Sequence, residues 1–345
     1  MTPKSLIRNI KWRFTKIFLN QRLQDWDKVK RINQSFKDGN VIPLDKYSKD
    51  APQKPCDKKR VVCIYDGMTK NGGLADRLRG IISVYGLCKE LGIDFKLIFN
   101  SPFKLSNFLI PNKVNWEIQD TELNYNTSIT DICYIVTLLG TEFEANKQRQ
   151  WFKKEFCKKY KEYHVRTNAQ FSYYEDFACL FDELFKFSPK LKTSIDKQKA
   201  ILSDNYISTS FRFMNLLDDF NEISGVDTVL SNAEKETLIA KSIEQLEFLH
   251  NKYPTMRILV NSDSKTFLHE TKKLDYVYVI PGNITHIDGD NNCNEYENYE
   301  KTFLDFFMIA NAEKIYLLRT GQMYNSGYPF AASKIYNRPF EKIEF

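Results

Sequence analysis

The sequence predicts an α/β protein built from two Rossmann-like domains that face a common cleft. Short apolar runs alternate with segments of helical periodicity, and a glycine loop joins the first run to the first helix. The length of 345 residues is enough for two hydrophobic cores. We expect an N-terminal extension and linker at 1–55, a first domain at 56–195 and a second domain at 196–345.

The first domain is expected to begin with a βαβ unit. Val61–Tyr65 is an apolar, β-branched run typical of a buried strand. Leu74–Leu91 carries apolar residues at helical spacing, and Gly92 is a suitable residue to end that helix. A second apolar strand is predicted at Phe95–Phe99, so a parallel sheet starts here.

The middle of the chain gives weaker patterns. Tyr134–Leu139 predicts a strand, and Phe152–Tyr163 and Tyr173–Phe187 predict helices. Pro189 and the polar stretch after it indicate the hinge between the domains.

The second domain shows the most regular alternation, typical of a doubly wound sheet. The expected strands are Tyr206–Arg212, Arg257–Asn261, Tyr276–Ile280 and Lys314–Leu318, and the expected helices are Glu234–Lys252, one from Lys265, Tyr299–Ala312 and one from near Ser326.

The composition excludes some classes of protein. With 42% hydrophobic residues, the composition is that of a globular protein. The surplus of six positive charges is too small and dispersed to predict nucleic-acid binding. The seven cysteines lack C-x-x-C spacing, so neither a zinc site nor a disulfide framework is predicted, and Cys63 and Cys88 are expected to be buried. Without an apolar run of about 18 residues or a signal peptide, we expect a cytoplasmic protein.

The basic N-terminal segment allows two interpretations. Residues 4–22 interleave apolar side chains with lysine and arginine. They form either an amphipathic helix in peripheral contact with the inner face of the membrane, or a helix packed on the protein with a solvated basic face. Residues 46–59, with two prolines and several charges, are expected to be a linker.

The first candidate site is the glycine loop, because ligands of open parallel sheets bind beyond the carboxyl ends of the strands. Gly72 and Gly73 allow the backbone to approach a ligand closely, and the helix behind them offers N–H groups to an anion. Asp76 and Arg77 lie in its first turn. The alternative is a plain turn in which Asp76 matches the helix dipole.

Three further candidates follow strands of the second domain. Arg212 ends a strand, where a guanidinium can bind a diphosphate through two donors. Ser262 and Asp263 follow the next strand and can receive a base or ribose, although capping of the next helix is the commoner use. Asn325 and Ser326 precede the last helix, where Ser326 can bind phosphate or cap the helix.

No metal site is predicted. Asp288 and Asp290 form an Asp-x-Asp pattern in a hydrophilic segment that we interpret as a solvated loop. The histidines, which show no spacing typical of metal ligands, are His164, His250, His269 and His286.

Together these features resemble the fucosyltransferase superfamily of GT-B architecture, which includes α1,2-, α1,6- and protein O-fucosyltransferases. Its motifs His-x-Arg-Arg-x-Asp, Ser-Asp and Ser-x-Phe-Ser correspond to Ser210-Phe-Arg212-Phe-Met-Asn215, Val260-Asn-Ser-Asp263 and Asn325-Ser326-Gly-Tyr-Pro-Phe-Ala-Ala-Ser333. Asn71-Gly-Gly-Leu-Ala-Asp-Arg77 is similar to its glycine loop. The histidine, the second arginine and the aspartate of the first motif are replaced here, so only Arg212 carries over.

The resemblance implies inverting, metal-independent transfer of a sugar, with fucose as first candidate, from a GDP-sugar to a glycan acceptor in polysaccharide biosynthesis, lipid-linked acceptors included. GDP-sugar is a co-substrate, and no cofactor is expected. Arg212 would stabilise the leaving diphosphate, and Asp76 is our candidate for the base. The expected donor-binding residues are Gly72, Gly73, Arg77, Ser262, Asp263, Asn325 and Ser326.

Two alternatives stay open at this stage. One is a metal-dependent transferase that uses Asp288 and Asp290. The other is a non-catalytic protein that binds nucleotide sugars or glycans, which the replaced motif residues would allow.

Overall fold

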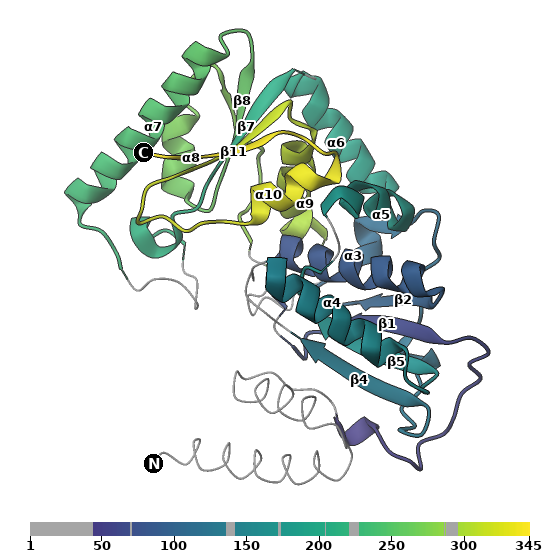
Figure 1. The fold of residues 1–345 in the computed structure, drawn as a ribbon. Helices are drawn as coiled ribbons and strands as arrows, with labels where there is room; N and C mark the ends of the chain where they lie inside the picture. Colours follow the sequence, from purple (N-terminus) through teal and green to yellow (C-terminus); the bar gives the residue numbers. More distant parts are fainter. Residues whose placement is uncertain are drawn as a thin grey trace, which may run out of the picture. The chain divides into compact units, whose positions relative to one another are not determined.

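The chain folds into two compact units (Figure 1). The computed structural model describes residues 44–69, 71–135, 142–171, 174–203, 205–220, 228–285, 287 and 296–345. Unit 1 comprises Met1–Lys104 and Pro111–Tyr173, and unit 2 comprises Leu105–Ile110 and Tyr174–Phe345. The sequence-based boundary at 195/196 therefore differs from the division between the units, and a short segment from the N-terminal half belongs to unit 2.

The residues around Pro189 explain this difference. Pro189 is the first residue of helix α6 (Pro189–Leu202), and the Ser188 side chain caps this helix by accepting a hydrogen bond from the backbone N–H of Leu191. Proline suits the first turn of a helix, where no intrahelical N–H bond is lost. Pro189, the expected hinge, therefore lies at the start of a helix inside unit 2 and not at the division between the units. Strand β3 (Leu109–Pro111) pairs with β6 (Phe185–Phe187), which brings residues 105–110 into unit 2.

Unit 1 contains a parallel sheet of four strands among the described residues, in the order β2-β1-β5-β4. The predicted βαβ unit is confirmed. It consists of β1 (Arg60–Tyr65), α3 (Leu74–Leu91) and β2 (Asp94–Phe99). Gly92 ends α3 in the left-handed conformation, and Cys63 and Cys88 are buried as expected.

The second half of unit 1 corrects the sequence prediction. Helix α4 (Glu142–Phe156) ends earlier than expected, and β5 (Glu162–Thr167) occupies the end of the predicted helix at 152–163. Strand β4 (Thr130–Ile135) begins before the predicted strand at 134–139, whose later residues lie outside the described part. The expected helix at 173–187 contains α5 (Phe177–Leu184) and then ends in β6.

Residues 44–54, expected to be mostly linker, pack on unit 1. After the turn η1 (Leu44–Lys46), the buried Tyr47 ring lies against Tyr125 and His164, with ring centroids 5.1 and 5.5 Å apart. The segment expected to contact a membrane, residues 4–22, lies outside the described residues. In the part of the chain that is described, no helix combines the length and apolar character needed to cross a bilayer.

Unit 2 contains a parallel sheet in the order β11-β10-β7-β8-β9, and its predicted alternation is confirmed. Its strands are β7 (Tyr206–Phe211), β8 (Arg257–Ser262), β9 (Val277–Tyr278), β10 (Lys314–Arg319) and β11 (Phe340–Glu344). Its further helices are α7 (Asn232–Lys252), α8 (Lys265–Thr271), α9 (Tyr296–Asn311) and α10 (Tyr328–Ile335). The edge strand β11 was not predicted, because its residues are partly exposed and mixed in polarity.

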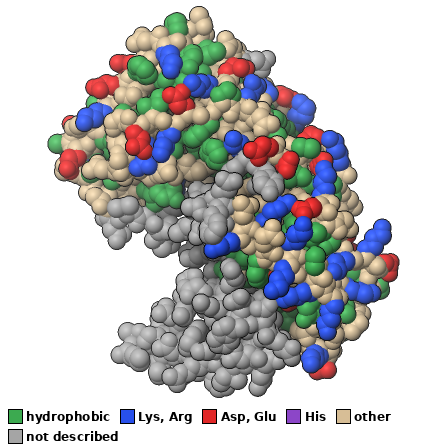
Figure 2. All heavy atoms as spheres, in the orientation of Figure 1, with side chains coloured by type: hydrophobic (Ala, Val, Ile, Leu, Met, Phe, Trp, Pro, Cys, Tyr) green, Lys and Arg blue, Asp and Glu red, His purple; other side chains and the backbone are tan. Residues whose placement is uncertain are grey.

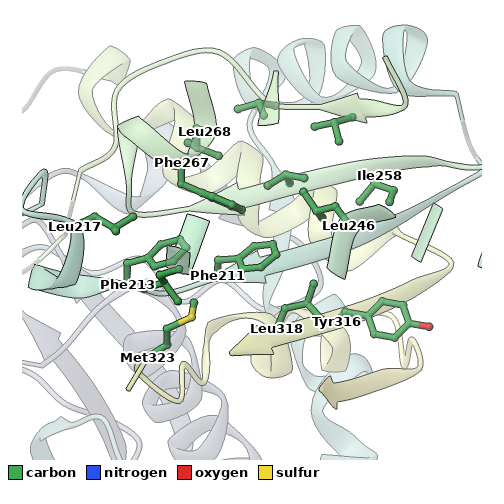
Figure 3. Packing of buried hydrophobic residues seen from close by; sticks show 14 of the residues in the cluster. Phe211, Phe213, Leu217, Leu246, Ile258, Phe267, Leu268, Tyr316, Leu318 and Met323 are labelled. Atoms are coloured by element: carbon green, nitrogen blue, oxygen red, sulfur yellow. The ribbon is translucent and has the colours of Figure 1, made fainter. Parts of the chain in front are cut away.

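The core of unit 2 fixes the residues on both sides of Arg212 (Figure 3). Phe211 and Phe213 are buried, and both rings contact Phe267 of α8, at centroid distances of 4.6 and 5.0 Å. Each fully buried phenylalanine contributes about 1.5–3 kcal/mol through burial alone. The backbone that carries Arg212 is therefore anchored at both neighbouring positions.

Candidate functional site

Arg212 follows the central strand of the unit 2 sheet, at the edge where parallel sheets bind ligands. Its side chain is 19% exposed, and its Nε lies 3.4 Å from Oδ2 of the buried Asp263. The guanidinium also lies over the ring of Phe220, 5.0 Å from the centroid. A cation is thus held at the carboxyl edge by a carboxylate behind it and by an aromatic ring.

Asp263 also holds the turn that follows Arg212. Its two oxygens accept the backbone N–H groups of Phe213 at 2.9 Å and Met214 at 2.7 Å. Met214 adopts a φ of +54°, which is unfavourable for a residue with a side chain, and these bonds help to secure it. Burial raises the pKa of the Asp263 carboxyl, and the charge of Arg212 and the two N–H groups oppose that rise. These contacts position Arg212 and its turn, while the donor-binding role expected for Asp263 stays a prediction.

The loop after β10 is joined to the same place. The backbone N–H of Tyr324 donates to the carbonyl oxygen of Arg212 at 3.1 Å. Asn325 and Ser326 follow, and Ser326 Oγ accepts the N–H of Tyr328 at 3.3 Å. The N-cap of α10 is Gly327. The structure thus brings the start of α10 and Arg212 to one edge of the sheet.

The turn that contains Ser262 leads into the cap of the next helix, which is the commoner use of such residues. Ser262 is buried, and its Oγ accepts the N–H of Ser264 at 3.1 Å. Ser264 is the N-cap of α8 and accepts the N–H of Phe267 at 3.0 Å. Asp219, which the sequence analysis did not single out, accepts both the Ser264 hydroxyl and the N–H of Thr266.

The glycine loop of unit 1 is bonded within itself. Gly72 has a φ of +74°, and a Cβ there would lie 2.4 Å from Oδ2 of Asp76. That oxygen accepts the N–H of Gly73 at 3.0 Å, while Asp76 Oδ1 forms an ion pair with Arg79. The structure therefore shows the capping role for Asp76, with the side chain still 35% exposed.

Arg77 is buried beneath this loop. Its Nε donates to the carbonyl of Gly72 at 3.0 Å, and its Nη1 donates to the carbonyl of Ser101 at 2.7 Å. The guanidinium also lies over the ring of Phe99 at 5.2 Å. These contacts give Arg77 a structural role that joins the loops after β1 and β2, beside the donor-binding role expected from the sequence.

The sequence did not predict an ion pair that lies at the carboxyl edge of the unit 1 sheet. Arg166 of β5 donates to both oxygens of Asp66, which directly follows β1, at 2.5 and 2.6 Å. Burial alone would raise the pKa of Asp66, but the hydrogen bonds and charge of Arg166 lower it below its usual value. Asp66 was visible as the residue after the first strand, whereas Arg166 lies on a strand that the sequence did not reveal. Nearby in the chain, the buried Asn71 Oδ1 has no hydrogen-bond partner among the described residues.

The described residues contain no group of three or more His, Cys, Asp or Glu side chains placed to hold a metal ion. Asp288 and Asp290, the pair considered for a metal, lie outside the described residues.

The two units thus define a protein with paired Rossmann-like domains, and comparison with known proteins shows the same fold. The sequence matches no protein-family model and no curated protein. The structure is similar to fucosyltransferase NodZ from Bradyrhizobium, with a TM-score of 0.52 and 12% identity over 84% of this chain and 94% of that chain. A NodZ α1,6-fucosyltransferase soaked with GDP-fucose gives 0.52, with 12% identity over 84% and 95%.

A plant protein shows the likeness as well. The structure of a mutant of Arabidopsis thaliana FUT1 in complex with GDP matches with a TM-score of 0.51 and 11% identity, covering 96% of this chain and 78% of that chain. These similarities confirm the predicted fold, the pair of Rossmann-like domains seen in fucosyltransferases. That the domains face a common cleft stays a prediction.

Proposed function

We propose that this chain is a glycosyltransferase that uses a GDP-sugar, with GDP-fucose as first candidate, and that unit 2 binds the donor. The observation that carries the proposal is Arg212, a partly exposed guanidinium supported by Asp263 at the carboxyl edge of the unit 2 sheet. The fold agrees with this assignment, because its solved neighbours include one soaked with GDP-fucose and one in complex with GDP.

The proposed chemistry is stabilisation of the leaving diphosphate. As the glycosidic bond breaks, negative charge grows on the diphosphate, and Arg212 would stabilise it electrostatically. The start of α10, with Asn325 and Ser326 before it, offers backbone N–H groups to the same anion. We further propose that the transfer inverts the anomeric centre and requires no metal. The acceptor would be a glycan or polysaccharide.

Asp76 is the candidate for the base that deprotonates the acceptor hydroxyl. Asp76 is exposed enough to reach a ligand, but one of its oxygens binds Gly73 and the other binds Arg79. An aspartate in these contacts serves the fold, so a catalytic role has to be tested separately from stability.

A second candidate function is binding without catalysis, and one observation favours it. Phe213 stands where the family motif carries a second arginine, and its side chain is fully buried against Phe211 and Phe267. This position therefore supplies no second cation. Measurable transfer or donor hydrolysis above that of heat-inactivated protein would reject this candidate.

A thermal-shift panel of GDP, GDP-fucose, UDP-sugars and dTDP-sugars tests the donor. A ligand at about 100 times its Kd stabilises a protein by about 2.7 kcal/mol. We expect the guanine nucleotides to raise the Tm and the others to leave it unchanged. A response to UDP-sugars alone, or an equal response to all, would contradict the proposal. Transfer that persists in EDTA would exclude the metal-dependent alternative.

A further inference from the structure

A group of lysines lies at the amino end of the unit 1 sheet, opposite to the edge where its ligands are expected. We call it the amino-edge basic surface. It consists of Lys58, Lys59, Lys154, Lys158, Lys159 and Lys161.

Hydrogen bonds bring these residues together. Lys59 Nζ donates to the carbonyl oxygens of Phe156 at 3.0 Å and Lys158 at 2.7 Å. The N–H of Arg60, at the start of β1, donates to the carbonyl of Lys161, just before β5, at 2.9 Å. The end of α4, the turn after it and the segment before β1 therefore form one continuous region.

The charge of this region is positive. The acidic residues beside the six lysines include Asp57, Asp94, Glu155 and Glu162. Glu155 is buried in a 2.9 Å ion pair with Lys158, and Glu162 is buried in a 2.7 Å ion pair with Arg60. Figure 2 shows Lys and Arg side chains gathered over the part of unit 1 that carries α4. Lys154, Lys159 and Lys161 are exposed, so their charges reach solvent.

Its position separates this surface from the candidate site. Lys58 and Lys59 precede β1, a strand of six residues, whereas Asp66 and the glycine loop follow it. At about 3.3 Å per residue the two ends are roughly 20 Å apart. A ligand bound at the carboxyl edge of the sheet would therefore not reach these lysines, and it does not explain why they lie together.

We propose that the amino-edge basic surface docks unit 1 on an anionic membrane. The negative surface potential of an anionic membrane attracts clustered lysines, and each one near the surface contributes about 1 kcal/mol. All six residues are lysines, compact point charges that suit a diffuse anionic surface better than the paired contacts arginine makes with nucleic acid. The partly exposed aromatic residues Trp151 and Tyr160 neighbour the lysines in sequence, and such side chains are favoured at membrane interfaces.

Co-sedimentation of the full chain with vesicles tests this proposal. We expect binding to phosphatidylcholine vesicles that contain phosphatidylglycerol, no binding to phosphatidylcholine alone, and loss of binding at raised salt. Each lysine near an anionic surface contributes about a fivefold factor in affinity, so Lys154→Glu, Lys159→Glu and Lys161→Glu together, which remove three positive charges and add three negative ones, should weaken binding by at least about a hundredfold. The matched control reverses three exposed lysines of unit 2, Lys197, Lys241 and Lys272, and should change binding less than about fivefold.

A second measurement locates the contact and does not depend on residues 1–43. Cys157 is exposed and lies between Lys154 and Lys158, while Cys179 is exposed in unit 2. With the other accessible cysteines replaced by serine, a polarity-sensitive fluorophore on Cys157 should shift its emission on anionic vesicles, and one on Cys179 should not. Equal loss of binding in both triple variants, no shift at Cys157, or binding to a soluble polyanion without a preference for anionic vesicles would each overturn the proposal.

Discussion

The carboxyl edges of the two sheets use their charged residues differently. In unit 1, Arg77 and Asp76 bind the loop that carries them, and Arg166 is paired with Asp66. In unit 2, Arg212 is partly exposed, and the buried Asp263 behind it holds both the arginine and its turn. An arginine that is itself buried, as Arg77 and Arg166 are, is therefore weaker evidence for a ligand site than one that stays partly exposed with a buried counterion behind it, as Arg212 does.

Among the substitutions that test this comparison, those of Arg212 are expected to have the largest effect, which falls on kcat. Arg212→Ala should lower kcat by roughly 10²–10³, the scale seen when one oxyanion-hole donor is removed, because diphosphate charge grows in the transition state. Arg212→Lys should recover part of the loss, since it keeps the charge without the paired donors. The measurement is the rate of transfer or of GDP release with GDP-fucose.

The matched control is Arg257, which starts β8 at the opposite edge of the same sheet and binds the carbonyl of Ile201. Arg257→Ala should keep near-normal turnover. Near-normal turnover in a folded Arg212→Ala protein would show that the active site lies elsewhere.

The next effect concerns the buried polar network of unit 1. Glu162 Oε2 accepts Arg60 Nε at 2.8 Å, and Oε1 lies 2.7 Å from His164 Nε2. Burial would raise the pKa of Glu162, but hydrogen bonds and charge from His164, with hydrogen bonds from Asn124, lower it to about 2. Because this pKa is lowered, Glu162 stabilises the fold above its ordinary pKa of 4.5, and that stability is lost as the pH falls towards 2.

Glu162→Gln should therefore cost about 3 kcal/mol at neutral pH, measured by urea unfolding, and the difference from wild type should shrink in acid. His164 acts in the same direction. Burial lowers its pKa, although Glu162 opposes this, so the fold loses stability as the pH drops below 6.5. Exposed Glu117→Gln is the control and should change stability by less than about 0.5 kcal/mol. If the free energy of unfolding of Glu162→Gln fell in acid as much as that of the wild type, the lowered pKa would not belong to Glu162.

A smaller effect is expected at two glycines that flank α3, where backbone strain can be separated from the contact that a Cβ would make. Gly72 and Gly92 both have a positive φ, at +74° and +65°. A Cβ at Gly92 meets nothing within 4 Å, whereas one at Gly72 would displace Asp76 from its cap. Gly92→Ala should cost about 1–2 kcal/mol, and Gly72→Ala roughly 1 kcal/mol more. Equal shifts of Tm in the two variants would show that the Asp76 contact contributes nothing.

The smallest effect is expected at Asp76. Asp76→Asn keeps an acceptor for the N–H of Gly73 but weakens the pair with Arg79. If Asp76 serves the fold, stability should fall by about 1 kcal/mol and kcat should stay within about tenfold; a general base would lose about 10²–10⁴. We expect the first outcome. The second would make the two carboxyl edges partners in catalysis.

The sequence revealed those parts of the fold whose signals are local. Val61–Tyr65 and Arg257–Asn261 are apolar runs, and α3 has a helical repeat with a glycine at its end, so these elements follow from patterns within a few residues. Strand β5 could not be found in this way. Glu162 and Arg166 are buried in it only because their partners arrive from positions about 100 residues away along the chain.

The same limit applies to the candidate site. Arg212 could be found as the residue after a strand, because strand ends in a parallel sheet mark the ligand edge. The structural roles of Asp263 and Arg77 could not be predicted from the sequence. They depend on backbone groups of Phe213 and Ser101 that only the folded chain brings near.

Residues 105–110 belong to unit 2 although the chain on both sides of them belongs to unit 1. This has a practical consequence for dividing the protein into fragments. Phe108 is fully buried in unit 2, its ring centroid lies 4.0 Å from that of Phe303, and its carbonyl accepts the N–H of Ser188 at 2.8 Å. A fragment cut at Tyr174 would lack this ring and leave a void that costs about 3–5 kcal/mol, as in a Phe→Ala substitution. Split reporters, domain exchanges and separately expressed halves therefore need to carry residues 105–110 with the C-terminal piece, for example as a grafted or added peptide.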